Sequence, residues 1–154
     1  MVTIFKDIQI TDLSYKLNLP KTVVSSVLTA YINYLQTKIA EGKTVKFLNI
    51  CYIRVYGCKE ETHETLAYIS YEIGKEVGQS QNVVYRILST YEESIISDIK
   101  SMFAYSIKGI VRLRLEKDYH GNLRVRAKKS TIYDGYDIRV ITTGSFKRKA
   151  ETLV

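Results

Sequence analysis

The sequence is poor in the residues that mark several classes of protein. It contains one proline, two cysteines and no tryptophan in 154 residues. Two cysteines are too few for a disulfide framework, and no Pro/Ser-rich tract provides a flexible linker. No apolar run reaches the roughly 18 residues that span a bilayer, and the first ten residues carry an acid too early for a secretion signal. We therefore expect a soluble, intracellular protein of one domain or two closely packed small units.

The chain also lacks the patterns that carry catalysis or bind metals. It has no phosphate-binding glycine loop, no HExxH, no GxSxG and no convincing pair of carboxylates. Cys51, Cys58 and His63 form an incomplete metal set. Neither His63 nor His120 has the positioned partner that general-base chemistry needs. We expect buried or idle thiols, no enzymatic activity, and no cofactor, metal or small-molecule substrate.

The positive charge is concentrated near the end of the chain. The formal net charge is +7. Residues 106–154 hold twelve Lys/Arg against five Asp/Glu, whereas residues 63–105 hold three against six. A local cationic field attracts polyanions or an acidic protein surface, and by itself it indicates nothing about catalysis.

One apolar pattern occurs twice. Residues 22–35 align with residues 82–95 at a constant offset of 60, without a gap. The matches recur at the spacing of one helix face. Any two amphipathic helices share such a stripe, so the stripe alone leaves a chance likeness open. The matching pairs are Val23 and Val83, Val24 and Val84, Val27 and Ile87, Leu28 and Leu88, Tyr31 and Tyr91, Leu35 and Ile95, and Ile39 and Ile99.

The residues around these stripes favour a true repeat. A shorter helical segment precedes each long one, at 11–17 and 66–77. Each is followed by a helix-start signal at the same register, Pro20 in the first copy and Ser80 in the second. Gly42 is a plausible C-cap of the first long helix, and two short β-rich runs follow it. Both copies therefore predict a short helix, a turn, a long helix and then strands.

A β-hairpin with one apolar and one cationic face is predicted after the second long helix. Hydrophobic and charged residues alternate on both sides of the turn DYHGN at 118–122. The apolar positions are Val111, Leu113, Leu115, Leu123, Val125 and Ala127, and the charged positions are Arg112, Arg114, Glu116, Arg124, Arg126 and Lys128.

The cationic strand face is the strongest functional signal, because guanidinium groups make bidentate contacts with phosphate or carboxylate. The alternative is a solvated outer face, since charged strands also block edge association. Thirteen tyrosines add a hint of an interface, although Tyr31, Tyr34 and Tyr91 fall on helical core stripes. The candidate residues for binding nucleic acid or a partner are Arg112, Arg114, Arg124, Arg126, Lys128, Lys129, Arg139, Lys147, Arg148 and Lys149.

The pattern from residue 19 to residue 55 resembles the HU/IHF family of histone-like DNA-binding proteins. Its helix start at Pro20, apolar helix positions, Gly42, Lys43 and two-strand run are similar to that family, and SFKRKA at 145–150 resembles the family's closing segment. The resemblance implies an α+β fold of tandem HU/IHF-like units packed as an intrachain pseudo-dimer. Residues 1–62 are expected to form a first unit without a β-arm, and residues 63–154 a second unit with the basic hairpin and a shortened arm.

The departures from the family bear on function. Asn49, Ile50 and Cys51 stand where the family has a glycine-aromatic-glycine turn, and the proline wedge of its DNA-bending arm is missing. Ile132 or Tyr133 is a candidate substitute wedge.

Two functions follow from the resemblance. HU/IHF-like proteins occur in tailed-phage virions, which implies a structural subunit of a larger assembly such as a neck or tail ring, contacting neighbouring copies or other subunits. The second is a free-standing architectural protein that binds double-stranded DNA in the cytoplasm or nucleoid of a bacterial host. The missing wedge and reduced arms favour the structural role. Neither function involves a membrane.

Overall fold

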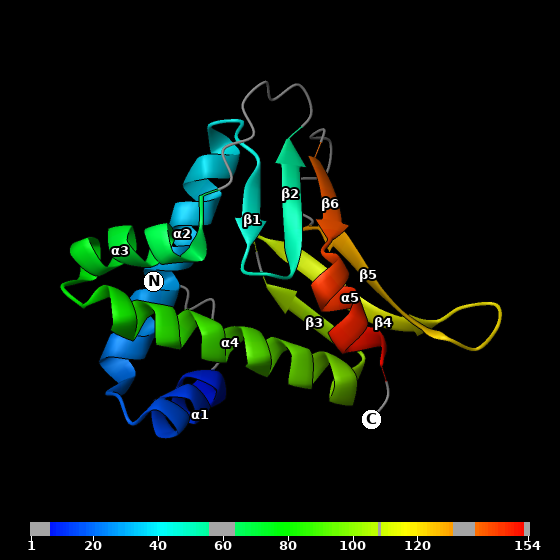
Figure 1. Cartoon of the computed structure of the whole chain (residues 1–154), viewed down its shortest axis with the longest axis horizontal. Helices are drawn as coiled ribbons and strands as arrows, with labels where there is room; N and C mark the ends of the chain where they lie inside the picture. Colours follow the sequence, from blue (N-terminus) through cyan, green and yellow to red (C-terminus); the bar gives the residue numbers. More distant parts are fainter. Residues whose placement is uncertain (1–6, 56–63, 108, 131–137, 153–154) are drawn as a thin grey trace. The chain divides into compact units, whose positions relative to one another are not determined.

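A computed structural model describes residues 7–55, 64–107, 109–130 and 138–152. As expected, this part of the chain is α+β, with five helices and two antiparallel sheets (Figure 1). No helix among these residues is both long and apolar enough to cross a membrane. The elements are α1 (Asp7–Leu17), α2 (Lys21–Ala40), β1 (Val45–Phe47), β2 (Cys51–Val55), α3 (Leu66–Val77), α4 (Gln81–Met102), β3 (Ala104–Ile107), β4 (Val111–Lys117), β5 (Leu123–Lys129), β6 (Ile138–Thr142) and α5 (Gly144–Glu151).

The short helices end one repeat apart, at Leu17 and Val77, and the long helices begin one repeat apart, at Lys21 and Gln81. Both short helices are followed by a residue in the left-handed region, Asn18 at φ 54° and Gly78 at φ 74°. These are the residue types that adopt this conformation at least cost. In each copy the next amide donates to the carbonyl five residues earlier, at 3.1 Å in the first copy and 2.9 Å in the second. Residues 60 positions apart therefore match in the turn after the short helix as well as in the apolar stripe of the long helix.

The same offset continues through the strands, where the sequence gives little sign of it. β1 pairs with β2 as β3 pairs with β4, and each pair is joined by a tight turn. In place of a glycine-aromatic-glycine turn, the first copy has Leu48 at φ 49°. Equivalent contacts are the register pairs Val45–Ile53 and Tyr105–Leu113, and the hydrogen bonds from Ile50 N–H to Phe47 O and from Ile110 N–H to Ile107 O, both 3.0 Å.

Each sheet receives its third strand from the last part of the chain. β5 follows β4 directly and pairs with it, giving the order β3-β4-β5. β6 instead pairs with β2, giving the order β1-β2-β6. The first sheet is therefore completed by residues of the second expected copy. β5 and β6 also contact each other across the two sheets.

Contacts divide the chain into two compact units, and their boundaries differ from those of the two expected copies. One unit comprises residues 1–34 and 64–91, and its described part is helical. The other comprises residues 35–63 and 92–154, and it contains all the described strands, α5 and the later parts of α2 and α4. Each compact unit thus draws on both expected copies, residues 1–62 and 63–154.

The apolar stripes are buried as predicted, except that Val23 and Val83 are only half-buried. Tyr31 and Tyr91 are almost completely enclosed, whereas Tyr34 is only half-buried. Cys51 is buried too, and burial raises the pKa of its thiol to about 12, so the thiol is protonated at neutral pH. Cys58 and His63 lie outside the described residues. The equivalent core pairs are Val24 and Val84, Val27 and Ile87, Leu28 and Leu88, Leu35 and Ile95, and Ile39 and Ile99.

One core position carries different residues in the two copies, and the difference affects the turn between β1 and β2. Glu92 stands where the first copy has Ile32, and it is only 9% exposed. Its Oε1 accepts the backbone N–H of Asn49 at 2.7 Å. The equivalent N–H of Gly109 donates to the buried Ser130 hydroxyl at 3.1 Å. The two copies thus satisfy the same turn amide with different side chains.

Candidate functional site

The outer face of the second sheet carries the predicted cationic stripe. Along β4 and β5 the hydrophobic side chains point inward, while the charged ones that alternate with them are exposed. Alternation follows from the two-residue period of a strand. We call this surface the basic face; it consists of Arg112, Arg114, Glu116, Arg124, Arg126 and Lys128.

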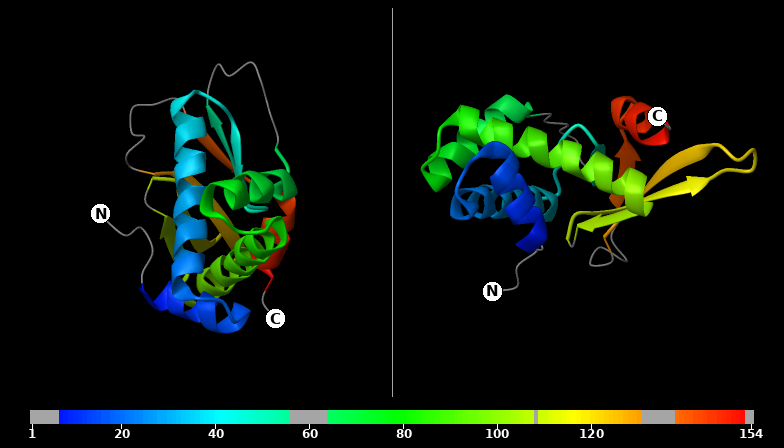
Figure 2. Two further views of the ribbon diagram at one scale, coloured as in Figure 1. Left: turned by 90° about the vertical axis from the view of Figure 1, so that its left-hand side faces the viewer. Right: turned by 90° about the horizontal axis from the view of Figure 1, so that it is seen from below.

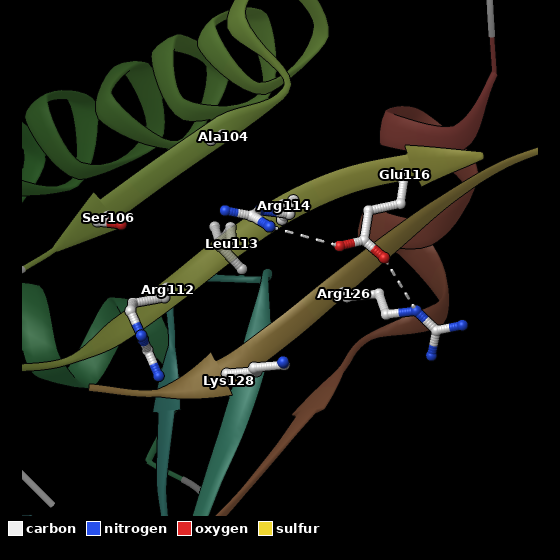
Figure 3. A pocket seen from close by; sticks show the side chains of 8 residues that line it. All are labelled: Ala104, Ser106, Arg112, Leu113, Arg114, Glu116, Arg126 and Lys128. Carbon is white, nitrogen blue, oxygen red and sulfur yellow. Dashed lines mark ion pairs between the residues drawn. The ribbon is translucent and has the colours of Figure 1, made fainter. Parts of the chain in front are cut away.

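Strand pairing arranges these side chains in rows across the sheet. Arg112 lies opposite Lys128, and Arg114 lies opposite Arg126. β3 contributes two small residues, Ala104 and Ser106, beside β4. Small neighbours leave a hollow of about 190 Å³, which Figure 3 shows over the middle of the sheet. The hollow is lined by Ala104, Ser106, Arg112, Leu113, Arg114, Glu116, Arg126 and Lys128.

Glu116 lies between the two opposed arginines. Its Oε1 is 3.9 Å from Arg114 Nη1, and its Oε2 is 3.6 Å from Arg126 Nε (Figure 3). All three side chains are substantially exposed, so each pair contributes little to stability. The carboxylate does reduce the repulsion between like charges facing each other across paired strands. The basic face is therefore a mixed-charge surface.

Arg124 is held at the end of the hairpin by two carboxylates. Its Nε is 3.1 Å from Asp118 Oδ2, and its Nη1 is 3.7 Å from Glu151 Oε2. Asp118 also accepts the backbone N–H groups of Asn122 and His120, both at 2.9 Å. The Asn122 hydrogen bond is the main cause that lowers the pKa of Asp118, with further contributions from Arg124 and His120. His120 is therefore a turn residue, as its sequence position indicated.

Helix α5 brings a second group of predicted residues to the same hairpin. Thr143 caps α5 by accepting the N–H of Phe146 at 3.1 Å. Near the other end of α5, Glu151 Oε1 accepts the N–H of Val125 in β5 at 3.1 Å. The right-hand view of Figure 2 shows α5 beside β5. A groove of about 680 Å³ between them is lined by Lys117, Gly121, Asn122, Leu123, Arg124, Lys147, Arg148, Glu151 and Thr152.

Three of the predicted residues lie elsewhere. Lys149 is exposed on α5 but does not line the groove. Lys129 pairs with the buried Val111, and alternation places it off the basic face; its carbonyl accepts from Arg112 Nε at 3.3 Å. Arg139 is on β6 in the first sheet. The wedge candidates Ile132 and Tyr133 are outside the described residues.

Arg139 pairs with Arg54, an arginine that the sequence analysis did not single out. Arg139 lies opposite Arg54 of β2, and both are exposed. Arg54 is one repeat before Arg114, which lies opposite Arg126. Each sheet thus carries a facing arginine pair at the equivalent position. The repeat offset extended into β2 would have pointed to Arg54, but its pairing with β6 has no local signal.

Within the residues that the structure describes, no group of three His, Cys, Asp or Glu side chains could hold a metal ion. The chemistry on the two outer sheet faces is that of ionic and hydrogen-bonding contact. Comparison of the chain with known protein families, curated proteins and solved structures finds no match.

Proposed function

We propose that this chain is a non-enzymatic structural protein with HU/IHF-like tandem architecture, packed as an intrachain pseudo-dimer. The offset of 60, which runs from the helices through both β-turns, supports the duplication. The intrachain pairing is supported by β6, which completes the sheet of the other copy. It is also supported by the compact units, each of which contains corresponding parts of α2 and α4.

The protein acts as a repeating subunit of a larger assembly, such as the neck or tail ring of a tailed phage, and docks through its basic face. The observation that carries this proposal is the mixed charge of that face, where Glu116 sits between Arg114 and Arg126. A protein surface offers both donors and acceptors and can complement such a pattern. A phosphodiester backbone offers acceptors only, and it repels Glu116.

The hairpin supports the same conclusion. The turn between β4 and β5 closes within Asp118–Asn122, where the Asp118 N–H donates to Asn122 O at 2.8 Å. The single proline of the chain, Pro20, precedes α2. The hairpin therefore has no proline wedge with which to kink a duplex.

A free-standing DNA-binding protein is the second candidate. It is favoured by the row formed by Arg112 and Lys128, where no ion pair with a carboxylate occurs among the described residues. Phosphate neutralisation by this row and by Arg54 and Arg139 would give an affinity that falls steeply with salt. Bending of the duplex is not expected from this candidate either.

The proposal is tested by comparing the native mass of the untagged wild-type protein with that of a variant that lacks the arginines of the basic face. Replacing all four arginines, R112Q, R114Q, R124Q and R126Q, should leave the monomer folded and abolish the large particle. A K16Q/K21Q variant removes exposed charges from the helical region and serves as the control. A wild-type chain that runs only as a small particle, yet binds duplex DNA with a steep salt dependence, would contradict the subunit role and favour the second candidate.

A further inference from the structure

Helix α3 has an exposed aromatic face that the fold does not require. Tyr68 and Tyr71 are 48% and 49% exposed. Their spacing, together with that of Glu72, places all three on one side of the helix. One repeat earlier the chain has Ile8 and Thr11, so the first copy forms the equivalent helix without these tyrosines.

The same face carries an excess of negative charge. Glu72, and to a smaller extent Glu64, raise the pKa of Tyr68. The pKa of Glu64 is raised first by desolvation and then by Glu72. Among the described residues of this face the cation is Lys75, which is 3.2 Å from Glu72 and 4.7 Å from the centroid of the Tyr71 ring. The local potential is therefore negative although the whole chain is basic.

A hollow adjoins this face within the helical unit. Its volume is about 410 Å³. It is lined by Tyr34, Glu72, Ile73, Lys75 and Glu76. Carboxylates beside an aromatic ring provide what an arginine side chain binds, since guanidinium groups pair with carboxylates and stack on rings. The Lys75 ammonium over Tyr71 occupies one such position already.

We propose that this α3 face, formed by Glu64, Tyr68, Tyr71, Glu72 and Glu76, docks onto the basic face of a second copy of the chain. The inference rests on the proposed function, for which it supplies the contact between subunits. Charge complementarity selects the partner surface. The α3 face is acidic, whereas the basic face carries five cations and one carboxylate. Tyrosine and arginine are also the residues that carry most binding energy at protein interfaces.

A contact between two different surfaces has a geometric consequence. Each copy would use its α3 face toward one neighbour and its basic face toward the next. Such a heterologous contact adds subunits head to tail, which closes into a ring or continues as a filament. This is the arrangement that a repeating subunit of a neck or tail ring requires.

Two variants of the full chain test the contact. The first, Y68S/E72K, damages the α3 face and keeps the basic face. The second, R114E/R126E, damages the basic face and keeps the α3 face. Sedimentation velocity should show that each variant alone self-associates at least about tenfold more weakly than wild type, because interface hot spots are removed. An equimolar mixture should form a discrete 1:1 dimer, since one intact face of each kind remains.

The controls separate this result from misfolding and from general charge effects. Far-UV circular dichroism should be unchanged in both variants, because all four substituted side chains are substantially exposed or half-exposed. A Y15S/E93K variant makes the same chemical changes at exposed positions outside the proposed contact and should assemble like wild type. Association of the wild type should also weaken as salt rises.

Three outcomes would overturn the inference. If Y68S/E72K assembled to the wild-type mass, the contact would be wrong while the proposed subunit role would stand. If both variants lost assembly but their mixture formed no dimer, the two faces would not bind each other. If purified wild type stayed monomeric at every concentration, copies would not dock in this way, and the subunit role would depend on other proteins in the native assembly.

Discussion

Replacing Glu92, which accepts the turn amide of the first copy, should destabilise the protein more than replacing Ser130, which accepts the equivalent amide of the second copy. In E92A the Asn49 N–H loses its 2.7 Å acceptor and the enclosed side chain leaves a gap. A hydrogen bond to a charged group contributes about 1.5–3 kcal/mol. Asn49 is itself exposed, so water can partly replace the carboxylate, and we expect a loss of about 2 kcal/mol in the free energy of unfolding.

The matched change is S130A, which removes the neutral acceptor of the Gly109 N–H. A hydrogen bond between neutral groups contributes about 1 kcal/mol, so the loss should be about half as large. E92Q keeps an acceptor without the charge and should fall between wild type and E92A. E92I installs the residue of the first copy and should behave like E92A, because the turn amide again lacks its acceptor.

Urea unfolding followed by circular dichroism measures these differences as shifts of the midpoint at constant slope. The reasoning would be refuted if E92A and E92I unfolded within about 0.5 kcal/mol of wild type, the range of ordinary surface substitutions. It would also be refuted if S130A cost more than E92A, since a charged acceptor should contribute more than a neutral one.

Two further predictions concern the turns. G74A should cost about 1–3 kcal/mol in urea unfolding, because an added Cβ would lie 2.5 Å from the backbone oxygen of Gln79; a variant as stable as wild type would contradict the close packing. The Asp118 pKa is lowered, so its turn contacts are fully present above the ordinary value of 3.8 and are lost as pH falls through the lower folded value. NMR of the His120 and Asn122 amides should show the change, and D118N should remove it.

The sequence predicted those helices and strands whose formation depends on residues close together in the chain. The apolar stripes of α2 and α4 indicated both helices, and strict alternation indicated β4 and β5. The strand repeat was not visible, because equivalent positions carry different residues, such as Val45 and Tyr105. The pairing of β6 with β2 was beyond sequence reasoning too. It joins residues far apart in the chain, and nothing in either strand selects its partner.

For the candidate site, too, the sequence predicted the local arrangement but missed the long-range contacts. Alternation placed the arginines of β4 and β5 on one face. It could not show that Glu116 bridges two of them, or that Glu151 reaches Arg124 from α5. Long-range ion pairs depend on how α5 packs against β5, which a single sequence does not encode locally. These carboxylates changed the interpretation of the face from a simple cation stripe to a mixed-charge surface.

The native mass of the untagged wild-type protein, measured directly from the cells or particles that produce it, tests the central claim most directly. The account predicts that the chain is recovered in a particle many times the 17.7 kDa of one copy, and that the quadruple Arg→Gln variant is released as a folded monomer. Recovery of the wild-type chain only as a free particle of one or two copies would contradict the claim that it is a repeating subunit.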